Sequence, residues 1–165
     1  MEQKNERHNL QAEKRAGVMT SRRKCRRLTH PHRLAEKGHE AKAMKRPKRD
    51  RVREERIHNE IIVDANGPEE QVMGWYYYLD DKIRFPFQAK CVKAKVVSPL
   101  RKGESVQVQS MAPEDACSAE MLVLIRWQGR TMAVPLSQLA AVDPDDSTAE
   151  AIADWHYWVA QGYCF

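Results

Sequence analysis

A helix and its abrupt end are encoded in residues 68–87, PEEQVMGWYYYLDDKIRFPF. Pro68 suits the first position of a helix, and the two glutamates after it favour the positive end of the helix dipole. Apolar side chains then recur at helical spacing, at Val72, Trp75, Tyr76, Leu79 and Ile83. Because Pro86 cannot continue a helix, we predict a helix that begins at Pro68 and gives way to a different kind of structure.

Short β-rich segments follow Pro86. They are rich in β-branched and other apolar side chains, and they cover residues 87–97, 104–111, 121–127 and 130–136. Gln128-Gly129, between the last two segments, is typical of a hairpin turn. Four strands with short connections predict a small antiparallel sheet or an SH3-like barrel, closed by one helical turn at residues 137–139.

Helical patterns flank this β region on both sides. Before it, an apolar stripe ends at Asn66-Gly67 and contains Val52, Ile57, Ile61, Ile62 and Ala65. A strand at residues 61–63 is the alternative there. After the β region, Ser147 is a favourable N-cap for an amphipathic helix that ends before Gly162. The predicted fold class is therefore α+β, with helices before and after a β module.

Charge is distributed unevenly along the 165 residues. Residues 1–55 contain 18 basic and 8 acidic side chains, against 10 and 15 in residues 56–165, so the two parts carry +10 and −5. All 12 aromatic residues lie from Trp75 onward. Residues 1–50 have too little apolar surface to offset chain entropy, so we expect a basic, largely disordered extension before a folded domain at residues 53–165. A start at Met44, which would make residues 1–43 optional, is left open.

The signatures of common enzyme classes are missing from the sequence. It has no glycine loop for phosphate, no G-x-S-x-G and no H-E-x-x-H. No apolar run approaches the roughly 20 residues that cross a bilayer, and the first ten residues are too polar for a signal peptide. We expect a cytoplasmic protein that is not an enzyme and has no membrane partner. The four cysteines lie far apart without a C-x-x-C motif, so we expect reduced thiols.

Carboxylates concentrate in short loops and at the ends of predicted elements. Calcium takes six to eight oxygen ligands, so several acidic pairs that converge could hold such an ion. The alternative is that they are ordinary solvated turns, since acidic loop tips are common. The EF-hand pattern does not occur. The candidate metal ligands are Asp80, Asp81, Glu114, Asp115, Asp143 and Asp145.

The basic extension suggests a second class of function. Lys and Arg bind phosphates by displacing counterions and need no fold to do so. No aromatic side chain is interleaved among them to stack on bases, so such binding would be weak and independent of sequence. The alternative to metal binding is therefore an interaction module that contacts nucleic acid or an acidic protein through residues 1–50. The oligomeric state is left open.

Four stretches are too particular to follow from composition: MGWYYYLDDKIRFPF at residues 73–87, MAPEDAC at 111–117, IRW followed by AVPLSQL between 125 and 139, and ADWHYWVAQGY at 153–163. Together they resemble the small calcium-binding family typified by the cyanobacterial protein CcbP. The resemblance covers residues 53–165. It implies a compact α+β protein that binds Ca²⁺ through surface carboxylates, without an EF-hand, and acts in calcium buffering, homeostasis or signalling.

The resemblance also assigns positions and shows departures. The carboxylate associated with the metal at the end of the GWYYYL helix maps to Asp80-Asp81, and the acidic pair of the A-P-E-D loop maps to Glu114 and Asp115. Members of the family are acidic throughout, whereas this β module carries several basic residues: Lys90, Lys93, Lys95, Arg101 and Lys102. The basic extension is likewise foreign to the resemblance.

Overall fold

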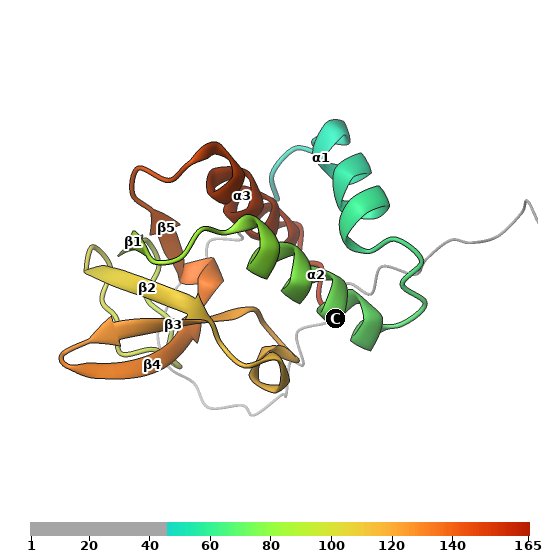
Figure 1. Cartoon of the computed structure of the whole chain (residues 1–165). Helices are drawn as coiled ribbons and strands as arrows, with labels where there is room; N and C mark the ends of the chain where they lie inside the picture. Colours follow the sequence, from blue (N-terminus) through green and yellow to red (C-terminus); the bar gives the residue numbers. More distant parts are fainter. Residues whose placement is uncertain (1–45) are drawn as a thin grey trace, which may run out of the picture.

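The computed structural model describes residues 46–165 as helices grouped on one side of a five-stranded sheet (Figure 1). The helices are α1 (Arg51–Arg56), the π-helix η2 (Ile57–Ile61), α2 (Pro68–Lys82), the 3-10 helices η3 (Glu114–Cys117) and η4 (Leu136–Gln138), and α3 (Asp146–Ala160). The strands are β1 (Phe87–Cys91), β2 (Ser105–Met111), β3 (Leu122–Trp127), β4 (Arg130–Pro135) and β5 (Leu139–Ala141). The predicted α+β class is confirmed.

Helix α2 begins at Pro68, as predicted, and its apolar side faces the core. Val72, Trp75, Tyr78 and Leu79 are buried. The helical spacing predicted Tyr76 as a core residue, but Tyr78 is buried in its place and Tyr76 is only half-buried. A Cβ placed on Gly74 would lie 2.1 Å from the backbone oxygen of Ile61, so glycine lets η2 pack directly against α2.

The sheet is antiparallel, with strand order β4-β3-β2-β1-β5. Gln128 and Gly129 both have positive φ, 48° and 77°, and form the predicted turn between β3 and β4. Strand β1 ends at Cys91, earlier than expected: Val92 still donates its N–H to Gln138 O, and the chain leaves the sheet after it. Strand β5 was not predicted, since its three residues are too few for a recognisable alternation.

Helix α3 has a different N-cap from the one expected. Asp145, not Ser147, caps it, and accepts from Thr148 N at 3.2 Å and Thr148 Oγ1 at 2.8 Å. Ser147 Oγ instead donates to Lys82 O at 3.0 Å and ties the start of α3 to the end of α2. Both residues have the short polar side chains that favour this position, so sequence alone did not separate them.

The segment before α2 also differs from expectation. The predicted continuous helix is divided into the short α1 and the π-turn η2, and Val52 is 70% exposed rather than part of the apolar stripe. The strand alternative at residues 61–63 is wrong, because Ile61 ends η2. Asp64, with φ of 54°, turns the chain before Asn66-Gly67.

Two further sequence-based expectations bear on this structure. Cys91 and Cys117 are free, buried thiols, whereas Cys164 is disulfide-bonded, so the expectation of reduced thiols fails at that residue. Residues 1–45, which make up nearly all of the predicted basic extension, lie outside the described residues. The predicted binding of nucleic acid or an acidic protein to this extension therefore stays a prediction. No helix between residues 46 and 165 is long and apolar enough to span a membrane.

Candidate metal centre

The end of α2 and the 3-10 turn η3 bring two of the predicted carboxylates to one place. Tyr77 OH donates a hydrogen bond to Glu114 Oε2 at 3.0 Å, which joins the two elements. The pKa of Tyr76 is raised mainly by its partial burial and also by the negative charges of Asp80 and Glu114. Asp80 and Glu114 therefore both lie close enough to Tyr76 for their charges to act on its phenol.

The other acidic residue of each pair extends this group outward. Asp81 follows Tyr77 by four residues and so lies on the same helix face. Asp115 follows Glu114 in η3, and both aspartates are exposed to solvent. Two carboxylates from a helix end and two from a facing turn thus form an acidic surface, which we call the α2–η3 surface.

Tyr77 is a residue of this surface that sequence reasoning did not identify. It is 54% exposed, which is unusual for a large aromatic side chain in a folded domain. Its hydrogen bond to the Glu114 carboxylate raises its pKa above the ordinary tyrosine value. The available signal was its position four residues before Asp81, on the side of the helix opposite the buried stripe.

The third acidic pair lies in the turn before α3 and has other partners. Both carboxylate oxygens of Asp145 accept hydrogen bonds from Thr148, and these bonds lower the pKa of Asp145. Asp143 is exposed and has a φ of 47°. The turn approaches the end of α2, because Arg84 N donates to Thr148 Oγ1 at 2.9 Å. Asp145 is thus already engaged in capping α3.

The donor chemistry of the α2–η3 surface suits a hard cation. Carboxylates are oxygen donors, which Ca²⁺ prefers. Within residues 46–165, however, no three Asp, Glu, His or Cys side chains lie together as a group that could hold a metal ion. A calcium site here would therefore rely on one or two carboxylates, with backbone carbonyls and water completing the coordination. The assignment of all six predicted ligands stays a prediction.

A buried carboxylate that was not predicted from the sequence holds together the helices next to this surface. Asp154 of α3 is completely buried. Arg56 makes two hydrogen bonds with it, Nε to Oδ2 at 2.9 Å and Nη2 to Oδ1 at 2.8 Å. Arg53 Nε lies 3.2 Å from Oδ1, and Tyr78 OH donates to Oδ2 at 2.9 Å.

These contacts join α1, α2 and α3 through one side chain. Because Asp154 is fully occupied by two guanidinium groups and a phenol, it is a structural anion and not a metal ligand. The sequence signal was weak: two arginines three residues apart on one predicted helix, and one aspartate within the tryptophan-rich helix.

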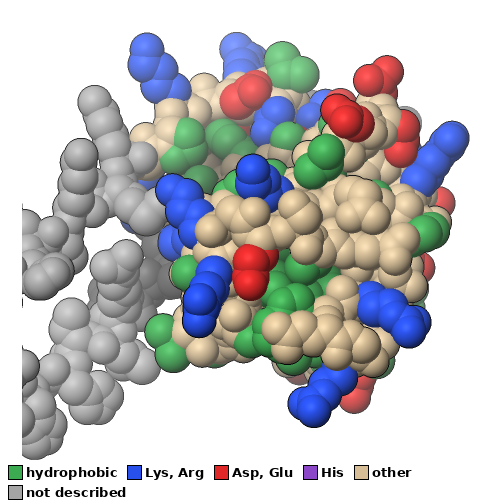
Figure 2. Space-filling view, turned by 90° about the vertical axis from the view of Figure 1, so that its left-hand side faces the viewer, with side chains coloured by type: hydrophobic (Ala, Val, Ile, Leu, Met, Phe, Trp, Pro, Cys, Tyr) green, Lys and Arg blue, Asp and Glu red, His purple; other side chains and the backbone are tan. Residues whose placement is uncertain are grey.

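The charged side chains of the sheet side differ from those of the α2–η3 surface. Figure 2, which views that side of the molecule, shows mainly Lys and Arg among the charged groups nearest the viewer. Lys90, Arg101 and Lys102 are exposed on β1 and in the connection to β2.

The fold is that of a small α+β protein with an acidic surface on its helical side. The model of the calcium-binding CcbP family, described as "Calcium binding", matches residues 55–159, more than half of the chain. The chain belongs to this family, which confirms the resemblance seen in the sequence. The family is one of calcium-binding proteins and not of enzymes.

Two solved structures are similar to this chain. The crystal structure of Anabaena CcbP is 48% identical, with a TM-score of 0.65, and the match covers 72% of this chain and 98% of that one. A calcium-binding protein in the calcium-binding form is 47% identical, with a TM-score of 0.64, and the match covers 71% and 96% of the two chains. No curated protein matches this chain.

Proposed function

We propose that this protein binds Ca²⁺ through surface carboxylates, without an EF-hand, and serves in calcium buffering, homeostasis or signalling in the cytoplasm. The observation that carries the proposal is membership of the calcium-binding family over residues 55–159. A solved relative that is 47% identical is in its calcium-binding form, which supports the same ion for this chain. The acidic α2–η3 surface supplies oxygen donors of the kind that calcium requires.

The proposed centre of the site is Asp80 with Glu114, because both lie close to Tyr76. Asp81 and Asp115 are the neighbouring carboxylates of the same surface. Asp143 and Asp145 are proposed as ligands of the turn before α3, where Asp145 would have to release at least part of its cap on Thr148. Exposed ligands and a large share of water favour a weak, rapidly exchanging site, which suits buffering.

Isothermal titration of the full chain with calcium tests the function and the site separately. We expect saturable binding by the wild type and weaker binding by two double variants, Asp80→Asn with Asp81→Asn, and Glu114→Gln with Asp115→Asn. The matched control is Glu60→Gln with Glu69→Gln, which removes the same charge from two exposed positions away from the surface.

The outcomes are distinct for the two parts of the proposal. If the wild type shows no saturable calcium binding, the function is wrong. If the wild type binds and both α2–η3 variants bind as tightly as the control, the site assignment is wrong and the function stands.

A further inference from the structure

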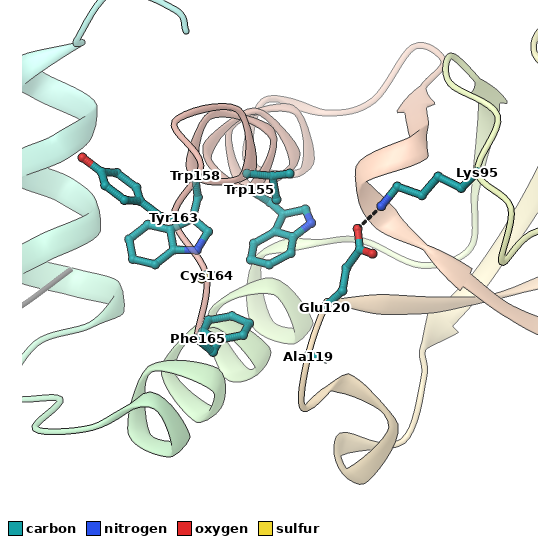
Figure 3. Close-up of a pocket in the computed structure, with 9 residues that line it drawn as sticks. Lys95, Ala119, Glu120, Trp155, Trp158, Tyr163, Cys164 and Phe165 are labelled. Carbon is teal, nitrogen blue, oxygen red and sulfur yellow. Dashed lines mark hydrogen bonds and ion pairs between the residues drawn. The ribbon is translucent and has the colours of Figure 1, made fainter. Parts of the chain in front are cut away.

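A cavity of about 210 Å³ opens between the end of α3, the last residues of the chain and the segment that follows β1 (Figure 3). At about 30 Å³ per water molecule, it has room for several waters or one small organic molecule. The side chains that matter for its chemistry are Lys95, Glu120, Trp155, Trp158, Tyr163 and Phe165. None of them belongs to the α2–η3 surface.

Aromatic rings form one end of this cavity. Trp155 and Phe165 stack with ring centroids 5.9 Å apart and an interplanar angle of 19°. Trp158 and Tyr163 lie beside them, with centroids 4.8 Å apart. Such walls favour a flat, largely apolar ligand body, because aromatic rings pack best in offset or edge-to-face arrangements.

The other end of the cavity is polar and has no net charge. Lys95 Nζ donates to Glu120 Oε1 and to Ser137 Oγ, the latter at 2.7 Å. Ser137 Oγ also donates to Glu120 Oε1. The ammonium and the carboxylate therefore neutralise each other, and Oε1 is saturated. Glu120 Oε2 accepts no hydrogen bond from residues 46–165 and is left for another donor.

A buried hydrogen-bond donor faces this carboxylate. Trp155 is only 2% exposed, and its Nε1–H has no hydrogen-bond partner among the described residues. Figure 3 shows the ring nitrogen of Trp155 on the side toward Glu120. Buried polar groups in folded proteins nearly always pair with protein, water or a ligand. A hydrogen-bond donor, Trp155 Nε1–H, and an acceptor, Glu120 Oε2, thus both belong to residues that line the cavity.

We propose that this cavity binds a small, uncharged, planar carboxamide. Its carbonyl oxygen would accept from Trp155 Nε1–H, its amide N–H₂ would donate to Glu120 Oε2, and its planar body would lie among the aromatic rings. At the polar end a charged ligand group is disfavoured, because Lys95 and Glu120 neutralise each other there. This binding is separate from the calcium function and uses none of its ligands.

Titration of the full chain with benzamide, followed by the indole N–H signals in a nitrogen–proton NMR spectrum, tests the proposal. The four tryptophans give four separate indole signals, so each acts as an independent reporter. We expect the Trp155 signal to move most, and to move toward the position of a hydrogen-bonded N–H. Acetophenone, which keeps the acceptor and lacks the donor, and benzoate, which is charged, should each bind about fivefold or more weakly than benzamide.

Two tryptophan variants give a matched comparison. Trp155→Phe removes the facing N–H and should weaken benzamide binding by about fivefold or more. Trp75→Phe removes another buried indole N–H that has no partner in the described part of the chain, but Trp75 does not line the cavity, so binding should stay within about twofold.

Three results would overturn the proposal. The first is that benzamide leaves the Trp155 signal in place, or moves all four indole signals equally. The second is that acetophenone or benzoate binds as tightly as benzamide. The third is a bound water that remains in contact with the Trp155 N–H when benzamide is added. Because these results need only the wild-type protein, the proposal stays testable even if a tryptophan variant fails to fold.

Discussion

Replacing Asp154 with asparagine is expected to destabilise the protein strongly while changing its shape very little. The carboxylate is completely buried and holds Arg56 by two hydrogen bonds, of 2.9 and 2.8 Å. It also raises the pKa of the Arg56 guanidinium, so the arginine stays charged at any relevant pH. An asparagine keeps one acceptor oxygen but presents an N–H₂ donor to a group that also only donates.

The size of the effect follows from burial. Removing one partner of a buried ion pair costs about 3–5 kcal/mol, because the other charge is left uncompensated. A matched control is Glu150→Gln, which removes the second carboxylate on Arg56, 2.9 Å from Nη1 but with its side chain 50% exposed. An exposed pair contributes about 0–1 kcal/mol. The difference in stability between the two variants thus measures how much the burial of a carboxylate adds to its contact with Arg56.

Urea unfolding at neutral pH measures both free energies of unfolding. A small domain has about 5–15 kcal/mol in total, so Asp154→Asn should lose a large fraction of its stability while Glu150→Gln stays near the wild type. If the two variants lie within about 1 kcal/mol of each other, the reasoning that α1 is held to α2 and α3 by a buried anion is wrong.

Three other results are expected. Gly74→Ala should lower the midpoint of thermal unfolding clearly, because its Cβ would lie 2.1 Å from Ile61 O; an unchanged midpoint would contradict the close packing of η2 on α2. Asp145→Ala should lower the free energy of unfolding at neutral pH, and the difference from the wild type should vanish in acid. Hydrogen bonds lower the folded-state pKa of Asp145, so the stability that its carboxylate contributes is present above its unfolded pKa of about 3.9. That stability is lost as the pH falls through the folded-state pKa. Calcium should lower the pKa of Tyr77, followed by tyrosinate absorbance, because it would neutralise the Glu114 carboxylate that raises this pKa; an unchanged pKa would argue against Glu114 as a ligand.

Elements with strong local signals were predictable from the sequence. Pro68 and the spacing of Val72, Trp75 and Leu79 gave α2 its start and its buried side. The Gln128-Gly129 turn gave the β3–β4 hairpin, because Gly129 adopts positive φ without strain between two β-rich segments. These features depend on neighbours in the sequence, which is the information that periodicity contains.

Features that depend on distant residues were not predictable. Strand β5 exists because Leu139–Ala141 pairs with β1, about fifty residues earlier in the chain. The buried role of Asp154 depends on arginines that lie 98 and 101 residues away along the sequence. Likewise, sequence could name Asp80 and Glu114 as metal-ligand candidates, but only tertiary structure brings them together around Tyr76.

A crystal structure of this protein soaked in calcium would show whether the α2–η3 surface holds the ion. We expect a calcium ion at the α2–η3 surface, with oxygens of Asp80 and Glu114 at about 2.3–2.6 Å and water completing its shell. Calcium bound elsewhere on the protein, with Asp80 and Glu114 still solvated, would contradict the proposed site. No bound calcium at a concentration that saturates the protein in solution would contradict it equally.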